Sequence, residues 1–330
     1  MKVRVGFAGA GGIASVHLKN LSQNEHVELV AVCDPLEAVA KQVAASYGMA
    51  PYTHIQSMLA CEQLDALFIC VPPFAHGVIE ELAIERGIHL FVEKPIGLDL
   101  ATVSRILQKI QQAAVITSTG YCLRYLDSVR KAKEYLQGKT IAMVRGHYLT
   151  RFVETNWWRE MEKSGGQLVE QSTHTVDLIR YLAGDVKQVY ANMALRVMDD
   201  IPRLDIPDVS SVNLVFASGA IGHVDSCFIQ TDNRMGLEIL GREFRVEMRG
   251  TAVTITDKDQ VFTYESEEDM YKKQVDAFME AVRTGNRDLI LAPYEEALKT
   301  LQVTLAANQS AITGMPEAIT NDFYYQELEK

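Results

Sequence analysis

Short apolar runs alternate with helical segments over the first 120 residues, and this alternation constrains the fold more than any other feature of the chain. The apolar runs predict strands at residues 3–8, 27–33, 66–71, 89–92 and 115–119. Between them, the sequence predicts helices at residues 13–21, 36–47, 76–86 and 100–113. Strands that are apolar on both faces belong to a parallel sheet covered by helices on both sides. The first part of the chain is therefore predicted to be a doubly wound α/β domain.

The pattern changes after Gly120. A helix is predicted first, and strand-like runs then follow one another at residues 141–149, 189–195, 209–216, 221–228, 235–240, 244–248 and 253–256. Such a succession indicates an antiparallel or mixed sheet with helices on one face. The acidic run 265–269 is predicted to begin a helix that ends at Gly285. We therefore divide the chain into a first domain, 1–120, and an α+β domain with a large, mostly antiparallel sheet, 121–330.

Length, charge and cysteine usage set further limits. A chain of 330 residues exceeds the size at which one hydrophobic core usually stops growing, which predicts two domains. The formal net charge of −11 argues against nucleic acids and anionic membranes as partners. Five cysteines without the spacing of a zinc site favour reduced thiols in a cytoplasmic protein with no metal.

A glycine-rich turn follows the first predicted strand. Gly9, Gly11 and Gly12, followed by Ile13 and Ala14, form a GxGxxA pattern that opens the first helix. Glycine allows a tight turn and lets a pyrophosphate approach main-chain N–H groups at a helix N-terminus. A plain turn is the alternative, but the position between strand and helix is the one that a dinucleotide site requires. The turn therefore predicts binding of NAD or NADP.

Asp34 ends the second predicted strand, at the position expected for the acid that binds the adenosine ribose. A carboxylate there accepts hydrogen bonds from the ribose hydroxyls and repels a 2′-phosphate. The residues that follow contain no arginine to hold such a phosphate, so we expect NAD rather than NADP as cofactor. The alternative is an Asp-Pro turn without a role in binding.

Two loops lie at the carboxyl ends of later strands, where open α/β sheets bind ligands. The loop with Pro72 and His76 is stiffened by two prolines and is predicted to line the cofactor site, with His76 at a helix start rather than in catalysis. In the second loop, Glu93 and Lys94 precede Pro95. A lysine at a strand end can stabilise charge on a reacting oxygen. A surface lysine before a turn is the alternative.

A further segment combines glycines, carboxylates and a histidine. Gly165 and Gly166 precede a predicted helix that carries Glu170, His174 and Asp177. A lone histidine on a helix is usually structural, whereas one with carboxylates four residues before and three residues after it is a better candidate for acid–base chemistry.

In this order, the glycine turn, the Glu93-Lys94-Pro95 tripeptide and the segment ending in His174 resemble the glucose–fructose oxidoreductase/inositol dehydrogenase/rhizopine catabolism (Gfo/Idh/MocA) family. The resemblance runs the whole length of the chain. It implies an N-terminal Rossmann domain and NAD(P)-linked oxidation or reduction at the carbinol of a sugar, cyclitol or related polyol. It also implies a cis Lys94–Pro95 peptide, Lys94 as the family's lysine, and His174 as its acid–base residue.

The chain departs from the family pattern at two positions. The family usually has aspartate four residues before the histidine and glycine two residues before it, whereas this chain has Glu170 and Ser172. The carboxylate is kept but is one methylene longer. The departure bears on the substrate more than on the reaction class, and we expect Glu170 to orient His174.

The resemblance also suggests which residues line the substrate pocket. These are Lys94, Glu170 and His174, together with Tyr121, Arg124 and Trp158, although aromatic residues are also ordinary core residues. Two other functions remain open: a glycosidase that uses NAD⁺ transiently, and a non-catalytic nucleotide-sensing regulator. We also expect a homodimer or homotetramer through the open face of the second sheet, because a half-covered sheet exposes apolar surface.

Overall fold

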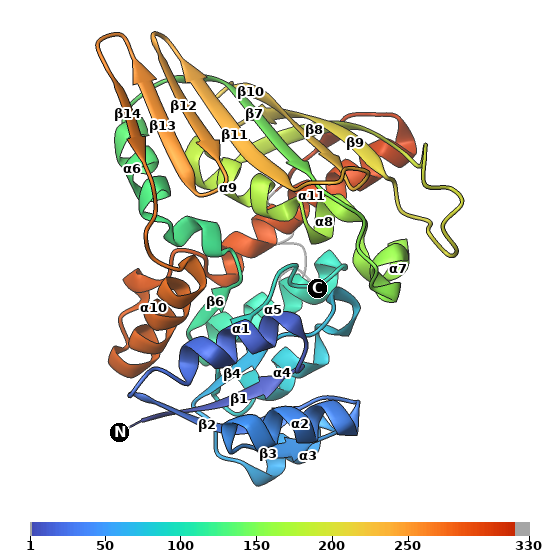
Figure 1. Ribbon diagram of the computed structural model, residues 1–330, viewed down its shortest axis with the longest axis vertical. Helices are drawn as coiled ribbons and strands as arrows, with labels where there is room; N and C mark the ends of the chain where they lie inside the picture. Colours follow the sequence, from blue (N-terminus) through green and yellow to red (C-terminus); the bar gives the residue numbers. More distant parts are fainter. Residues whose placement is uncertain (1, 321–330) are drawn as a thin grey trace. The chain divides into compact units, whose positions relative to one another are not determined.

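A computed structural model describes residues 2–320 of the chain (Figure 1). Its contacts divide the chain into two compact units, each made of two segments. The first unit joins Met1–Tyr125 to Glu268–Ala297, and the second joins Leu126–Glu267 to Leu298–Lys330. The sequence pattern placed one boundary at residue 120, so it did not predict that the chain returns to the first unit. The last ten residues of the predicted second domain, 321–330, lie outside the described residues.

The first unit contains a parallel sheet of six described strands in the order β3-β2-β1-β4-β5-β6. Its strands are β1 (Val3–Ala8), β2 (Val27–Cys33), β3 (Ala50–Tyr52), β4 (Ala66–Ile69), β5 (His89–Val92) and β6 (Thr117–Thr119). Its helices are α1 (Gly12–Leu21), α2 (Glu37–Tyr47), α3 (Ile55–Cys61), α4 (Val78–Ile84), α5 (Leu100–Ala113) and α10 (Met270–Thr284). The strand order is that of a doubly wound Rossmann sheet, as predicted.

Helix α10 belongs to the first unit because its apolar face completes that unit's core. Val275, Phe278 and Met279 are buried in one cluster with residues of β1, β4 and β5. Asn24 Nδ2, in the loop after α1, also donates to Asp276 Oδ1 over 3.1 Å. The carboxylate of Asp269 caps the helix by accepting the N–H groups of residues 271 and 272, so the acidic run does precede a helix as predicted.

The second unit contains a sheet of nine described strands in the order β14-β13-β12-β11-β7-β10-β9-β8-β15, in which only the β7–β10 pair is parallel (Figure 1). The strands are β7 (Ile141–Leu149), β8 (Val186–Ala194), β9 (Val209–Phe216), β10 (Ile221–Cys227), β11 (Arg234–Gly241), β12 (Phe244–Arg249), β13 (Ala252–Asp257), β14 (Val261–Tyr264) and β15 (Glu317–Ala318). The large, mostly antiparallel sheet is thus confirmed. The sequence did not predict β14, β15 or the short β3.

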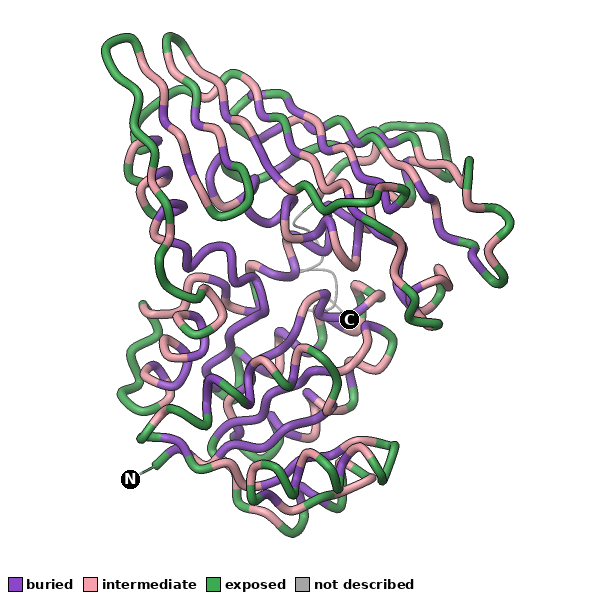
Figure 2. The backbone as a smooth tube through the Cα atoms, viewed as in Figure 1, coloured by how far each residue is buried: buried purple, intermediate pink, exposed green. Residues whose placement is uncertain are grey.

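Helices cover one face of this sheet. They are α6 (Asp127–Leu136), α8 (Gln167–Glu170), α9 (Thr173–Ala183) and the part of α11 (Tyr294–Thr313) that belongs to the second unit, and the short α7 (Met161–Ser164) comes just before α8. A side chain at Gly146 of β7 would meet Thr175 and Ile179 of α9, so glycine lets the helix approach the strand closely. Buried and less buried residues alternate along the strands (Figure 2). None of the described helices is both long and apolar enough to cross a bilayer.

The opposite face of the sheet carries charged side chains at its centre. Arg145 and His147 of β7 and His223 and Asp225 of β10 alternate with the buried residues of those strands. Glu238 of β11 is paired with Arg145 across the sheet. The outward positions at the centre of the sheet are therefore polar, whereas the prediction of an oligomer was argued from exposed apolar surface.

Candidate active site

The glycine turn is shaped by two different requirements. Gly9 has φ of +90°, and a Cβ there would lie 2.4 Å from the carbonyl oxygen of Cys70, so only glycine fits between β1 and the end of β4. Gly11, the residue just before α1, and Gly12 differ, since no described heavy atom lies within 4 Å of a Cβ built on either, apart from their own chain neighbours and the backbone of α1. Ala14 is fully buried beneath them. The turn thus leaves open space over the first main-chain N–H groups of α1, which include that of Ile13.

Asp34 is tied to this turn. One oxygen of its carboxylate accepts the N–H of Ala10 over 3.1 Å, and the other accepts the N–H of Leu36 over 2.9 Å. The structure therefore brings the predicted pyrophosphate-binding and ribose-binding residues together within the first unit. An open glycine turn at a helix N-terminus with a carboxylate beside it fits a dinucleotide.

His76 is held by a buried carboxylate. Its Nδ1 lies 2.5 Å from Oε1 of Glu80, and the N–H of Gly77 donates to Oε2 of Glu80 over 2.7 Å. The Glu80 side chain is completely buried, and only 2% of the His76 side chain is exposed. This arrangement agrees with the expected place of His76 at a helix start. Pro72 stands just before the short helix η1 (Pro73–Ala75).

Glu93 and Lys94 follow the carboxyl end of β5. The Lys94–Pro95 peptide is cis, as predicted. Glu93 is 5% exposed; its Oε2 accepts the N–H of Lys94 over 3.1 Å, and its Oε1 lies 2.7 Å from Nε2 of His17 on α1. His17 was not among the predicted site residues, although its spacing from Ala14 and Leu21 places it on the buried side of the helix.

Tyr121 and Arg124 are deeply buried within the first unit, at 1% and 2% exposure. Arg124 lies in the short helix η2 (Cys122–Tyr125), donates from Nη1 to the carbonyl of Leu291 over 2.7 Å, and lies 3.6 Å from the carboxylate of Glu296. Their role in substrate binding stays a prediction, and these contacts give Arg124 a structural role as well.

In the second unit, Trp158 holds Glu170. The indole N–H of Trp158 donates to Oε2 of Glu170 over 2.8 Å. Trp158 is 1% exposed and lies edge-on to Phe228, with ring centroids 4.9 Å apart, in a cluster that includes Ile206. Since its ring faces are covered, Trp158 acts on the candidate site through Glu170 and has no free face for a sugar ring.

Glu170 and His174 lie on either side of a helix break. Glu170 ends α8, and His174 lies in the first turn of α9, which begins after Ser172. The carbonyl of Gly165, just before α8, accepts a hydrogen bond from Asn308 Nδ2 over 2.8 Å. Both Glu170 and His174 are partly exposed, as a pair that meets substrate requires.

Asp177 belongs to a buried network. Thr300 Oγ1 donates to its carboxylate over 3.0 Å, and Arg180 donates to the same Thr300 oxygen over 2.8 Å. All three residues are at most 4% exposed. Of the two carboxylates that flank His174 in the sequence, Glu170 is therefore the better candidate for orienting it.

Two buried thiols of the first unit, Cys70 and Cys122, have raised pKa values and stay protonated. Burial, followed by the negative charge of Glu93, raises the pKa of Cys70 well above its usual range and that of Cys122 to about 12. All five cysteines lie among the described residues and are free thiols. Within residues 2–320, no three side chains of the metal-binding types are grouped so that they could hold an ion.

Comparison with known proteins links both halves of the chain to one group of enzymes. Residues 3–121 match the family model described as "Oxidoreductase family, NAD-binding Rossmann fold", and residues 129–255 match the "GFO/IDH/MocA C-terminal domain".

Relatives and solved structures cover nearly the whole chain. The chain is 26% identical to myo-inositol 2-dehydrogenase of Thermotoga maritima over 93% of its own length and 96% of the relative. It is 27% identical to scyllo-inositol 2-dehydrogenase (NAD(+)) of Bacillus subtilis over 96% of each chain. A levoglucosan dehydrogenase solved with NADH has the same fold, with a TM-score of 0.88 at 18% identity, covering 97% of this chain and 100% of the other.

Proposed function

Because the chain belongs to the Gfo/Idh/MocA family of NAD-binding oxidoreductases, we propose that it interconverts a carbinol and a ketone of a cyclitol, sugar or related polyol. Two relatives that match over more than nine-tenths of the chain are named inositol 2-dehydrogenases, which favours a cyclitol or a similar ring polyol. The observation that carries the proposal is the pairing of an open, Asp34-linked glycine turn with Lys94 at the end of β5, both in one unit.

The glycine turn and Asp34 would hold the cofactor, with the pyrophosphate over Gly11 and Gly12 and the ribose hydroxyls at the carboxylate. Pro72, His76 and Glu93, at the carboxyl ends of β4 and β5, would line the same site. The bound cofactor would supply the hydride chemistry, as acceptor from the carbinol carbon in oxidation and as donor to the ketone in reduction. The Asp34 charge opposes a 2′-phosphate, so NAD is the expected cofactor.

Lys94 and His174 would share the chemistry at the reacting oxygen. The Lys94 ammonium would donate a hydrogen bond to that oxygen and stabilise the developing alkoxide charge. His174 would remove the hydroxyl proton in oxidation and return it in reduction, and Glu170 would orient the imidazole. The indole N–H of Trp158 donates to one carboxylate oxygen of Glu170 and so fixes the direction of this side chain.

A panel of inositols, sugars and linear polyols, assayed with NAD⁺ and with NADP⁺, tests the proposal by the absorbance of reduced cofactor. We expect turnover of a ring polyol with the higher kcat/KM for NAD⁺. Comparable kcat/KM for both cofactors would remove the role given to Asp34. Cleavage of a glycoside without net cofactor reduction would instead identify the enzyme as a glycosidase.

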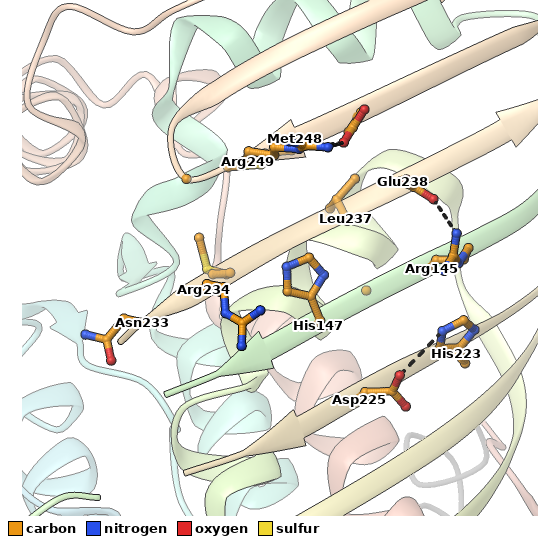
Figure 3. A pocket seen from close by; sticks show the side chains of 14 residues that line it. Arg145, His147, His223, Asp225, Asn233, Arg234, Leu237, Glu238, Met248 and Arg249 are labelled. Carbon is orange, nitrogen blue, oxygen red and sulfur yellow. Dashed lines mark hydrogen bonds and ion pairs between the residues drawn. The ribbon is translucent and has the colours of Figure 1, made fainter. Parts of the chain in front are cut away.

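We also infer that the open face of the second sheet forms a homodimer or homotetramer. A cavity of about 520 Å³ lies on this face, lined by residues of both charges (Figure 3). Arg145 lies 2.8 Å from Glu238, and Arg249 lies 2.6 Å from Glu247. A face that carries both signs can match itself about a two-fold axis, which a face of one charge cannot. A monomeric mass by light scattering at micromolar concentration contradicts this inference.

The free thiols suit a reducing compartment, and we propose that the enzyme is cytoplasmic.

A further inference from the structure

His17 is an imidazole completely buried inside the first unit. It lies on α1, is 0% exposed, and is surrounded by the rings of Phe68, Phe91 and Tyr271, whose centroids lie 5.6, 4.9 and 6.3 Å from its own. Its Nε2 lies 2.7 Å from Oε1 of Glu93, 76 residues further along the chain. A buried histidine in an aromatic cage that reaches a buried carboxylate needs an explanation beyond packing.

The carboxylate that His17 contacts is fixed from several sides. Its second oxygen accepts the N–H of Lys94, and a side chain at Gly120 would lie 2.4 Å from that oxygen, so glycine is required to admit the carboxylate. Glu93 therefore links His17 directly to the main chain of Lys94. His17 and Glu93 are both buried, which holds this link in one geometry.

The two oxygens of Glu93 have different neighbours. Oε2 accepts the N–H of Lys94, and Oε1 lies beside Nε2 of His17. A carboxylate oxygen accepts and an imidazole N–H donates, so we assign the bond as His17 Nε2–H to Glu93. The other ring nitrogen of His17, Nδ1, is buried and has no hydrogen-bond partner among the described residues, so the bond to Glu93 is the polar contact that orients the ring.

We propose that His17 is a positioning residue for Lys94. By holding Glu93, it fixes the peptide from which the Lys94 side chain projects. Because His17 and the glycine turn lie on the same helix, the turn that would hold the cofactor and the lysine that would hold the reacting oxygen are positioned by one rigid element. The inference rests on the proposed function, which gives Lys94 its role at that oxygen.

Three variants separate positioning from packing. His17→Phe keeps an aromatic ring in the cage and removes the donor, whereas His17→Gln keeps a donor at a similar reach. Phe68→Leu disturbs the same cage without touching the bond to Glu93. With the ring polyol as substrate, we expect His17→Phe to lower kcat by about 10- to 100-fold, His17→Gln to restore most of it, and Phe68→Leu to lower only the melting temperature. The dissociation constant for NAD should change little in all three.

The rate at which an amine-specific reagent labels Lys94, followed by mass spectrometry of its peptide, provides a readout that does not require turnover. A changed labelling rate in His17→Phe but not in Phe68→Leu supports the proposal even if no polyol is oxidised, in which case only the proposed function fails. Wild-type kcat and wild-type labelling in His17→Phe would overturn the positioning role. If His17→Phe does not fold, Glu93→Gln, which replaces one of the two carboxylate oxygens with an amide nitrogen, must show the same loss of kcat and the same change in labelling, or the proposal is wrong.

Discussion

The two units place their candidate site residues by different means. In the first unit, the site residues are positioned mainly by the main chain. Gly9 fits only as glycine, Asp34 accepts a main-chain N–H of the turn, and Glu93 accepts the N–H of Lys94. In the second unit, side chains hold one another, as Trp158 holds Glu170. A site built on the backbone keeps its shape when nearby side chains change, whereas a site built on side-chain bonds changes with each partner.

This difference suits the two tasks. A dinucleotide presents the same pyrophosphate and ribose to every enzyme that binds it, so a fixed backbone cradle serves it well. A substrate pocket differs between relatives, and the Glu170 and Ser172 departures from the family pattern both fall in the second unit. We infer that substrate choice in this chain depends on the contacts of Glu170.

The largest expected effect tests whether the second unit serves the chemical step while the first unit binds the cofactor. His174→Ala should lower kcat by about 10²- to 10⁴-fold, the usual span for general acid–base catalysis. The dissociation constant for NAD, measured by titration calorimetry, should stay close to the wild-type value, because the predicted cofactor residues are in the first unit. His223→Ala, on the open face of the second sheet, is the control and should leave kcat unchanged. A wild-type rate in His174→Ala would leave Lys94 as the candidate for both roles.

Substituting alanine for two glycines of the same turn should affect different properties, stability at Gly9 and NAD affinity at Gly11. In Gly9→Ala, alanine must adopt a positive φ, and its methyl group meets the carbonyl oxygen of Cys70. The backbone strain alone should lower the free energy of unfolding by about 1–3 kcal/mol. Gly11→Ala places its methyl group in open space, so its melting temperature should match the wild type while its affinity for NAD falls. Thermal unfolding and NAD titration of both variants decide the matter. Equal destabilisation by both would contradict the division of roles within the turn.

Trp158→Phe tests the side-chain bond of the second unit. It keeps an aromatic ring but removes the donor to Glu170, and a hydrogen bond to a charged group is worth about 1.5–3 kcal/mol, or roughly 10- to 150-fold in kcat/KM. Phe152→Leu, which loosens the same cluster without that bond, is the control. If both variants lose melting temperature but neither loses kcat/KM, Trp158 serves only the core.

The sequence predicted the first unit's sheet and turn well because their signals are local. Apolar runs, glycine spacing and the position of Asp34 can each be recognised within a few residues of the chain. Two features of the first unit depend on contacts between distant parts of the chain and were not predicted. Helix α10 returns to complete the first core, and β3 is a three-residue strand that contains Pro51.

In the candidate site too, positions that follow from local sequence were predicted, whereas contacts between distant residues were not. The positions of Asp34 and Lys94 follow from strand ends. The partner of Glu170 does not follow from spacing, since Trp158 was expected to line the substrate pocket and the structure buries it. Conversely, Asp177 has helical spacing from His174 yet contacts Thr300, 123 residues away. The signal for His17 was present in the helical period, but its partner Glu93 was not predictable from it.

The smallest expected effect compares one histidine from each unit under acid. Burial, followed by the positive charge of Arg287, lowers the pKa of His89, and its Nδ1 accepts the N–H of Ile116 over 3.0 Å. Burial, followed by Arg234, also lowers the pKa of His147 on the open face of the second sheet. An unfolded histidine takes up a proton near pH 6.5. Below that value the unfolded chain therefore binds protons that the folded chain does not, and the free energy of unfolding falls as the pH falls.

His89→Asn should reduce the acid-induced decrease in the free energy of unfolding more than His147→Gln does. The Asn side-chain oxygen can accept the same N–H from Ile116 without titrating, so the variant keeps the bond and removes the acid sensitivity at that position. Two carboxylates, Asp225 and Glu238, partly offset the effects that lower the pKa of His147, whereas only Asp65 does so for His89, so the share of His147 should be smaller. Melting temperatures of wild type and both variants at about pH 7 and about pH 5 provide the comparison. A decrease between these pH values that is as large in His89→Asn as in the wild type would mean that the main-chain bond to His89 does not contribute to the acid sensitivity of the first unit.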